Sequence, residues 1–89
     1  MAERLNSNSQ TIESAVWTPA DDCWLQLDTA SDTASVDVQV RLMTDGPWTT
    51  IETLHRTVKP ITRIAYGTAL KLVLRGNSTG ASVKVRDQT

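Results

Sequence analysis

The 89-residue sequence predicts one all-β domain, an antiparallel β-sandwich or jelly-roll-like barrel of about seven short strands. Apolar and polar residues alternate with a period of two in several segments, which is typical of half-buried strands. The sequence holds thirteen Thr and eight Val, β-branched residues that pack well on a pleated surface. Turn-forming residues separate the segments at the spacing expected of a sandwich or barrel.

The first ten residues are polar and show no period. They predict a flexible N-terminal arm over residues 1–10, followed by a single β domain over residues 11–89. An alternative is an arm that becomes ordered only when it contacts a neighbouring subunit.

Two short strands are expected next. The first covers residues 12–16, with Ile12 and Val16 on one side, and ends before Pro19. The second covers residues 23–28 and places alternate side chains on its core face. These core residues are Cys23, Leu25 and Leu27, and they leave Trp24, Gln26 and Asp28 on the opposite face.

The clearest alternation covers residues 36–43. Its predicted core residues are Val36, Val38, Val40 and Leu42, with Asp37, Gln39, Arg41 and Met43 facing outward. The Asp45-Gly46 pair predicts a hairpin turn, and residues 48–54 form the return strand.

The second half contains three more predicted strands. Residues 55–60 form a charged connection, and residues 61–66 form a strand. Residues 68–75 alternate cleanly, and a glycine-containing loop over 76–80 leads to the last strand. The inward residues of these last two strands are Leu70, Leu72, Leu74, Ala81, Val83 and Val85.

The formal net charge is −1, but the charges are segregated along the chain. Residues 1–54 hold nine acids and two bases (−7), and residues 55–89 hold one acid and seven bases (+6). Such a distribution is compatible with nucleic-acid binding. It is equally compatible with attraction between the two halves of one chain, or between neighbouring copies.

Four basic residues lie on outward positions of two consecutive predicted strands, so they are expected to form one basic face. They are Lys71, Arg75, Lys84 and Arg86. Such a face could bind phosphates, but no aromatic follows Tyr66 to stack on bases, which argues against a nucleic-acid partner. The outward acids Asp28 and Asp37 could instead pair with these bases across strands or between copies.

No catalytic group, metal site or cofactor site is predicted. Cys23 and His55 are the only residues of their types, and nothing near either supports thiol chemistry. Two such residues are too few for a structural zinc site. Trp24 and Trp48 are expected in the core or between subunits, and the alternative is that they are exposed platforms for sugar rings.

Residues 40–51, Val-Arg-Leu-Met-Thr-Asp-Gly-Pro-Trp-Thr-Thr-Ile, resemble a strand–turn–strand segment of many β-sandwich binding domains, including discoidin-like domains and carbohydrate-binding modules. Residues 11–87 resemble, in the order of their features, small β-sandwich structural proteins of tailed bacteriophages. This second resemblance implies a capsid decoration (cement) protein, or a small head or tail accessory part.

Such a role implies the major capsid protein or other virion proteins as partners, and a homo-oligomer. It places the protein on the capsid surface after assembly in the host cytoplasm. No apolar run approaches the length of a membrane span, so no membrane partner is expected. A carbohydrate-binding module and a single-stranded nucleic-acid-binding protein are the alternatives.

Overall fold

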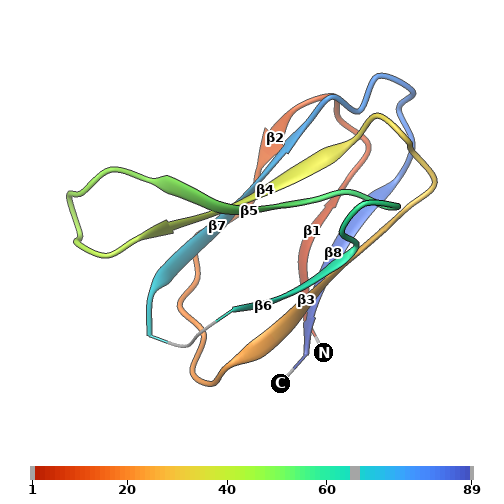
Figure 1. The fold of residues 1–89 in the computed structure, drawn as a ribbon. Coiled ribbons are helices and arrows are strands. Elements are labelled where there is room, and N and C mark those ends of the chain that lie inside the picture. Colours follow the sequence, from red (N-terminus) through yellow and green to blue (C-terminus); the bar gives the residue numbers. More distant parts are fainter. Residues whose placement is uncertain (1, 65–66, 89) are drawn as a thin grey trace.

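The computed structural model describes residues 2–64 and 67–88, which form two four-stranded antiparallel sheets packed face to face (Figure 1). The strands are β1 (Ala2–Ser7), β2 (Ile12–Glu13), β3 (Cys23–Thr29), β4 (Ser35–Arg41), β5 (Thr49–Leu54), β6 (Ile61–Ile64), β7 (Ala69–Arg75) and β8 (Val83–Gln88). Sheet 1 has the order β1-β8-β3-β6, and sheet 2 has the order β2-β7-β4-β5. The predicted all-β sandwich class is therefore confirmed.

The strand order is that of an eight-stranded jelly roll. Consecutive strands alternate between the two sheets, and only the β4–β5 hairpin joins neighbours within one sheet. The chain therefore crosses the sandwich at nearly every connection. As a result, strands that follow each other in sequence usually have outward faces on opposite sides of the molecule.

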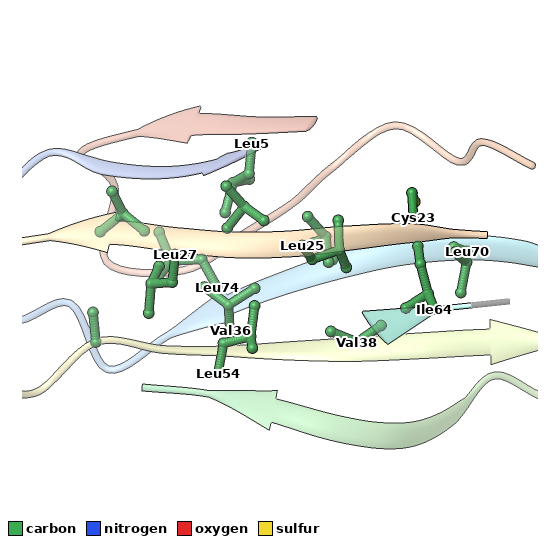
Figure 2. Packing of buried hydrophobic residues seen from close by; sticks show 14 residues of the cluster. Leu5, Cys23, Leu25, Leu27, Val36, Val38, Leu54, Ile64, Leu70 and Leu74 are labelled. Carbon is green, nitrogen blue, oxygen red and sulfur yellow. The ribbon is translucent and has the colours of Figure 1, made fainter. Parts of the chain in front are cut away.

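The core fills the space between the sheets with leucine and valine side chains (Figure 2). The predicted inward positions that lie within β3, β7 and β8 are all buried: Cys23, Leu25, Leu27, Leu70, Leu72, Leu74, Val83 and Val85. Ala81, predicted to be an inward residue of the last strand, precedes β8 and is half-buried. Each fully buried Leu or Val contributes about 1.5–3 kcal/mol relative to an exposed one. The period of two is therefore a reliable guide where a strand lies in the middle of a sheet.

The structure differs from the sequence prediction at the N-terminus. Residues 2–7 of the predicted arm form β1, which pairs with β8 at the edge of sheet 1. Leu5 is buried, and Nε of Arg4 donates to Oδ2 of Asp87 at 2.6 Å. A single apolar residue in a polar stretch shows no period, so the strand becomes visible only through its partner β8.

The predicted strand over residues 12–16 is shortened to the two residues of β2. Ser14 interrupts the ladder because its hydroxyl oxygen accepts the Leu72 N–H at 2.9 Å, while its own N–H donates to the Leu72 carbonyl at 2.8 Å. Val16 is consequently exposed, and Trp17 packs against the core instead.

The hairpin predicted at Asp45-Gly46 is present, but β4 ends at Arg41, before the predicted strand does. The Gly46 N–H donates to the Met43 carbonyl at 2.9 Å, so the turn begins at Met43. Leu42, predicted to be a core residue, is therefore exposed. Farther along the chain, β6 ends at Ile64, and positions 65 and 66 of the predicted strand lie outside the described residues.

Candidate functional site

The four basic residues predicted to share one face are divided between the two sheets. Lys71 and Arg75 lie on β7 in sheet 2, and Lys84 and Arg86 lie on β8 in sheet 1. The inner faces of the sheets pack against each other, so the outward side chains of β7 and β8 point in opposite directions. The prediction of a single basic face is wrong, because the chain crosses the sandwich between the two strands.

The outward surface of sheet 2, here called the paired face, is held together by its own side chains. Nε and Nη2 of Arg75 donate to Oδ2 and Oδ1 of Asp37 at 2.8 and 3.1 Å, and the Thr53 hydroxyl donates to Oδ1 of Asp37 at 2.8 Å. The hydrogen bond to Asp37 raises the pKa of the Arg75 guanidinium. Asp37, predicted to be an outward charge, is buried under these donors.

Trp48 also belongs to the paired face. Its ring lies 4.6 Å from the Arg41 guanidinium carbon and 4.8 Å from Nζ of Lys71, within the range of cation–π attraction. The Lys71 ammonium additionally pairs with Glu13 at 2.6 Å. The half-buried Trp48 ring therefore lies between two cations, and its faces are not open to a ligand.

The outward surface of sheet 1, here called the open face, is arranged differently. Its side chains stand in rows across the strands: Gln88, Trp24 and Arg63 in the first row, Glu3, Arg86, Gln26 and Ile61 in the second, and Asn6, Lys84 and Asp28 in the third. Trp24 and Ile61 are each 45% exposed. The guanidinium carbon of Arg63 lies 5.3 Å from the Trp24 ring centroid.

The polar side chains in the middle of the open face have no partners within the part of the chain that the structure describes. No hydrogen bond or ion pair is made there by the side chains of Gln26, Asp28, Lys84, Arg86 or Gln88. Asp28 and Lys84 are opposite each other across β3 and β8, yet they do not form an ion pair. A depression of about 360 Å³ is lined by Gln26, Leu27, Asp28 and Arg86.

A second exposed feature is the hairpin tip, residues 42–47, which projects beyond the body of the sandwich (Figure 1). Leu42 is 81% and Met43 is 67% exposed. The Gly46–Met43 hydrogen bond closes the turn, and Trp48 fixes the base of the hairpin against Arg41 and Lys71. Two adjacent large apolar side chains are therefore exposed to solvent on a hairpin whose turn and base are both held in place.

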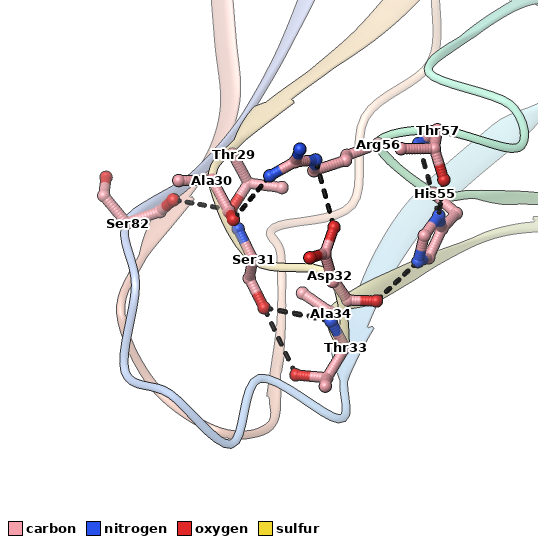
Figure 3. Close-up of polar contacts among 10 residues, drawn as sticks. All are labelled: Thr29, Ala30, Ser31, Asp32, Thr33, Ala34, His55, Arg56, Thr57 and Ser82. Atoms are coloured by element: carbon pink, nitrogen blue, oxygen red, sulfur yellow. Dashed lines mark hydrogen bonds and ion pairs between the residues drawn. The ribbon is translucent and has the colours of Figure 1, made fainter.

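The loops at one end of the sandwich form a polar network around His55 (Figure 3). Nε2 of His55 is 2.7 Å from the Asp32 carbonyl oxygen, and Nδ1 accepts the Thr57 N–H at 3.3 Å. Since a carbonyl only accepts, Nε2 carries the proton. Arg56 donates to the Ala30 carbonyl at 2.8 Å and pairs with the Asp32 carboxylate at 3.2 Å. Nε2 of His55 therefore joins two loops, while Nδ1 bonds within its own loop.

Cys23 lies at the opposite end of the sandwich from His55. Cys23 opens β3, whereas the loop that His55 contacts follows the end of this seven-residue strand, a separation of about 20 Å. Burial raises the pKa of the Cys23 thiol, and nearby Asp87 raises it further. The two residues therefore cannot act as a thiol–imidazole pair.

Of the predicted site residues, Trp24, Asp28, Lys84 and Arg86 meet on the open face, while Asp37, Lys71, Arg75 and Trp48 meet on the paired face. Sequence reasoning placed Gln26 on the outward face with Trp24 and Asp28 but did not include it among the site residues, and it missed Ile61 and Arg63 as parts of the open face. Their outward alternation was the available signal, but it does not show which strands are neighbours. It also missed Leu42 and Met43, which were assigned to a strand.

No protein-family model, curated protein or solved structure matches this chain. Within residues 2–64 and 67–88, no cluster of three or more His, Cys, Asp or Glu side chains is arranged to hold a metal ion. That part of the chain also has no helix long and apolar enough to cross a membrane.

Proposed function

We propose that this chain is a non-enzymatic virion structural protein of a tailed phage, a capsid decoration protein that binds the coat-protein shell through its hairpin tip. The observation that carries the proposal is the exposure of Leu42 and Met43, 81% and 67%, on a braced hairpin. Adjacent exposed apolar side chains are typical of protein interaction sites. The partner surface is an apolar pocket on the major capsid protein.

The energetics favour such a contact. Burying a Leu and a Met side chain contributes about 3–6 kcal/mol before the costs of association. Those costs are reduced because the hairpin is already held in one conformation by the turn at Met43 and by the contacts of Trp48 with Arg41 and Lys71. A small apolar anchor can therefore provide most of the binding energy, as interface hot spots do.

Two further points support a virion role. The resemblance of residues 11–87 to small phage structural proteins is one, and the jelly-roll topology, which recurs in viral capsid proteins, is the other. Because a fold hosts many functions, the docking mechanism is argued from the hairpin. Neither an exchanged N-terminal arm nor a split-charge contact between copies enters it, since β1 is part of sheet 1 and Asp37 pairs with Arg75 in the same chain.

The test uses particles of the phage whose genome encodes the chain, prepared without this protein, together with the purified protein. Wild-type protein is expected to sediment with the particles at a fixed ratio to coat protein. The Leu42→Asp, Met43→Asp double variant is expected to bind at least about 100-fold more weakly, a loss of about 2.7 kcal/mol.

Thr44→Ala, at an exposed polar position in the same tip, is the matched control and is expected to bind like the wild type. Wild-type protein that stays in the supernatant would refute the virion role. A double variant that binds normally would refute docking through the hairpin tip.

A further inference from the structure

Among the described residues, the open face has one aromatic ring, that of Trp24, and planar polar side chains follow it along β3 and β8. Trp24 is 45% exposed, and Gln26 and Asp28 follow it on the same side of β3. Alternate residues of a strand are about 7 Å apart, so a sugar ring stacked on Trp24 would place its hydroxyl groups over Gln26. An aromatic platform next to amide and carboxylate groups is suited to a ligand with one apolar face and many hydroxyls.

The depression next to Gln26 and Asp28, on the same face of the sheet as Trp24, has matching chemistry. Its lining includes an acceptor, Asp28, a donor, Arg86, and an amide that does both, Gln26. In the described chain these three side chains make no hydrogen bond or ion pair, so their bonding capacity is available to a ligand. The two charges of the lining cancel, which favours a neutral ligand over an anionic one.

The paired face provides an internal contrast. It also carries a tryptophan, an aspartate and an arginine, yet Trp48 is covered by Arg41 and Lys71, and Asp37 is occupied by Arg75 and Thr53. On the open face, Asp28 and Arg86 make no hydrogen bond or ion pair among the described residues, and the 45% exposed Trp24 has one guanidinium, that of Arg63, 5.3 Å from its ring centroid.

We propose that the open face binds a neutral oligosaccharide, with one hexose ring stacked on Trp24 beside Gln26 and the hydroxyls of the next ring bonded to Asp28 and Arg86. This site goes beyond docking through the hairpin tip. The hairpin belongs to sheet 2, and the site lies on the outer surface of sheet 1. One copy could therefore bind a shell and a saccharide at the same time.

The experiment follows the three tryptophan indole N–H signals by NMR while the whole chain is titrated with lactose, maltotriose or chitotriose. At least one of these neutral probes is expected to shift the Trp24 signal in a saturable way. Sialyllactose and a single-stranded oligothymidylate serve as anionic probes and are expected to bind more weakly.

Variants locate the site. Trp24→Ala, followed on its backbone amide signals because it lacks the Trp24 indole, is expected to weaken binding about tenfold or more through loss of the stacked ring. Asp28→Asn is expected to weaken binding several-fold. Trp48→Phe is the matched control and should bind like the wild type. Asp28→Asn keeps the test decisive if Trp24→Ala does not fold.

The proposal is overturned if none of the three neutral saccharides shifts the Trp24 signal, or if only the sialylated sugar or the oligonucleotide does. It is also overturned if folded Trp24→Ala and Asp28→Asn both bind with wild-type affinity. None of these results affects the hairpin, since particle binding is measured on Leu42 and Met43.

Discussion

The paired face and the open face are built from similar residues. They differ in whether those side chains form hydrogen bonds and ion pairs with one another. Asp37 on sheet 2 accepts three hydrogen bonds from Arg75 and Thr53. Asp28 on sheet 1 faces Lys84 across the strands without forming an ion pair. Charged and aromatic residues on a sheet therefore do not identify a binding surface by their presence. The useful criterion is whether the fold leaves them without partners.

Ion pairs within the chain account for part of the segregated charge of the sequence. Among the described residues, five ion pairs join an acid of the first half to a base of the second: Asp22–Arg63, Asp32–Arg56, Glu52–Lys59, Glu13–Lys71 and Asp37–Arg75. Of the interpretations left open by the sequence, attraction within one chain accounts for much of the pattern. Most of these pairs are partly exposed, so each contributes only about 0–1 kcal/mol.

The largest expected effect comes from removing the edge strand that completes sheet 1. Deletion of residues 1–7 is expected to lower the free energy of unfolding by about 3 kcal/mol or more, measured by urea denaturation. The deletion removes the buried Leu5 and leaves β8 as an unprotected edge.

Two point variants sharpen that test. Leu5→Ala alone should cost about 2–3 kcal/mol, whereas Asn6→Ala, at an exposed position on the same strand, should change stability by less than about 0.5 kcal/mol. Unchanged stability on deletion would show that these residues are a mobile arm after all.

A matched pair of aspartates tests the two faces directly. Asp37→Ala is expected to destabilise the protein by about 1–3 kcal/mol, because it removes three hydrogen bonds from a buried carboxylate. Asp28→Ala is expected to stay within about 0.5 kcal/mol. Equal costs in urea denaturation would mean that the open face is also internally bonded, and the contrast would fail.

The tryptophans give a smaller difference in the same direction. Trp48→Ala is expected to lower the melting temperature more than Trp24→Ala does. Replacing Trp48 removes two cation–π contacts, worth about 0.5–1 kcal/mol each. Replacing Trp24 removes the one cation–π contact described for it, with Arg63. Calorimetry of both variants measures this, and the opposite order would show that Trp24 is the structural residue.

Strands in the middle of the sheets could be predicted from the sequence, because both of their edges are paired and one face is fully buried. The alternation of Leu70, Leu72 and Leu74, for example, survives intact as the core face of β7. The edge strands β1 and β2 could not be predicted as well, although the edge strand β5 matches its predicted range, 48–54, to within one residue. At β2, the Ser14 hydroxyl replaces a regular ladder bond, and Val16 turns to solvent.

About half of the candidate site was within reach of the sequence. The outward row Trp24, Gln26 and Asp28 follows from the period of β3 alone. The addition of Arg86 and Ile61 required knowing that β8 and β6 flank β3, although β8 is far away in sequence. The availability of Leu42 and Met43 depended on where the turn begins, which the Gly46–Met43 hydrogen bond decides.

The sequence by itself determined the all-β class, the central strands, the hairpin at Asp45-Gly46 and the core leucines and valines, because period and turn chemistry are local properties. Only the tertiary structure decided that β7 and β8 lie in different sheets and that residues 2–7 complete an edge. It also decided that one face pairs its charges, while the other leaves Asp28, Lys84 and Arg86 without a partner among the described residues. These properties depend on which distant strands become neighbours. The pattern of residues along one strand does not determine which strands pair with it.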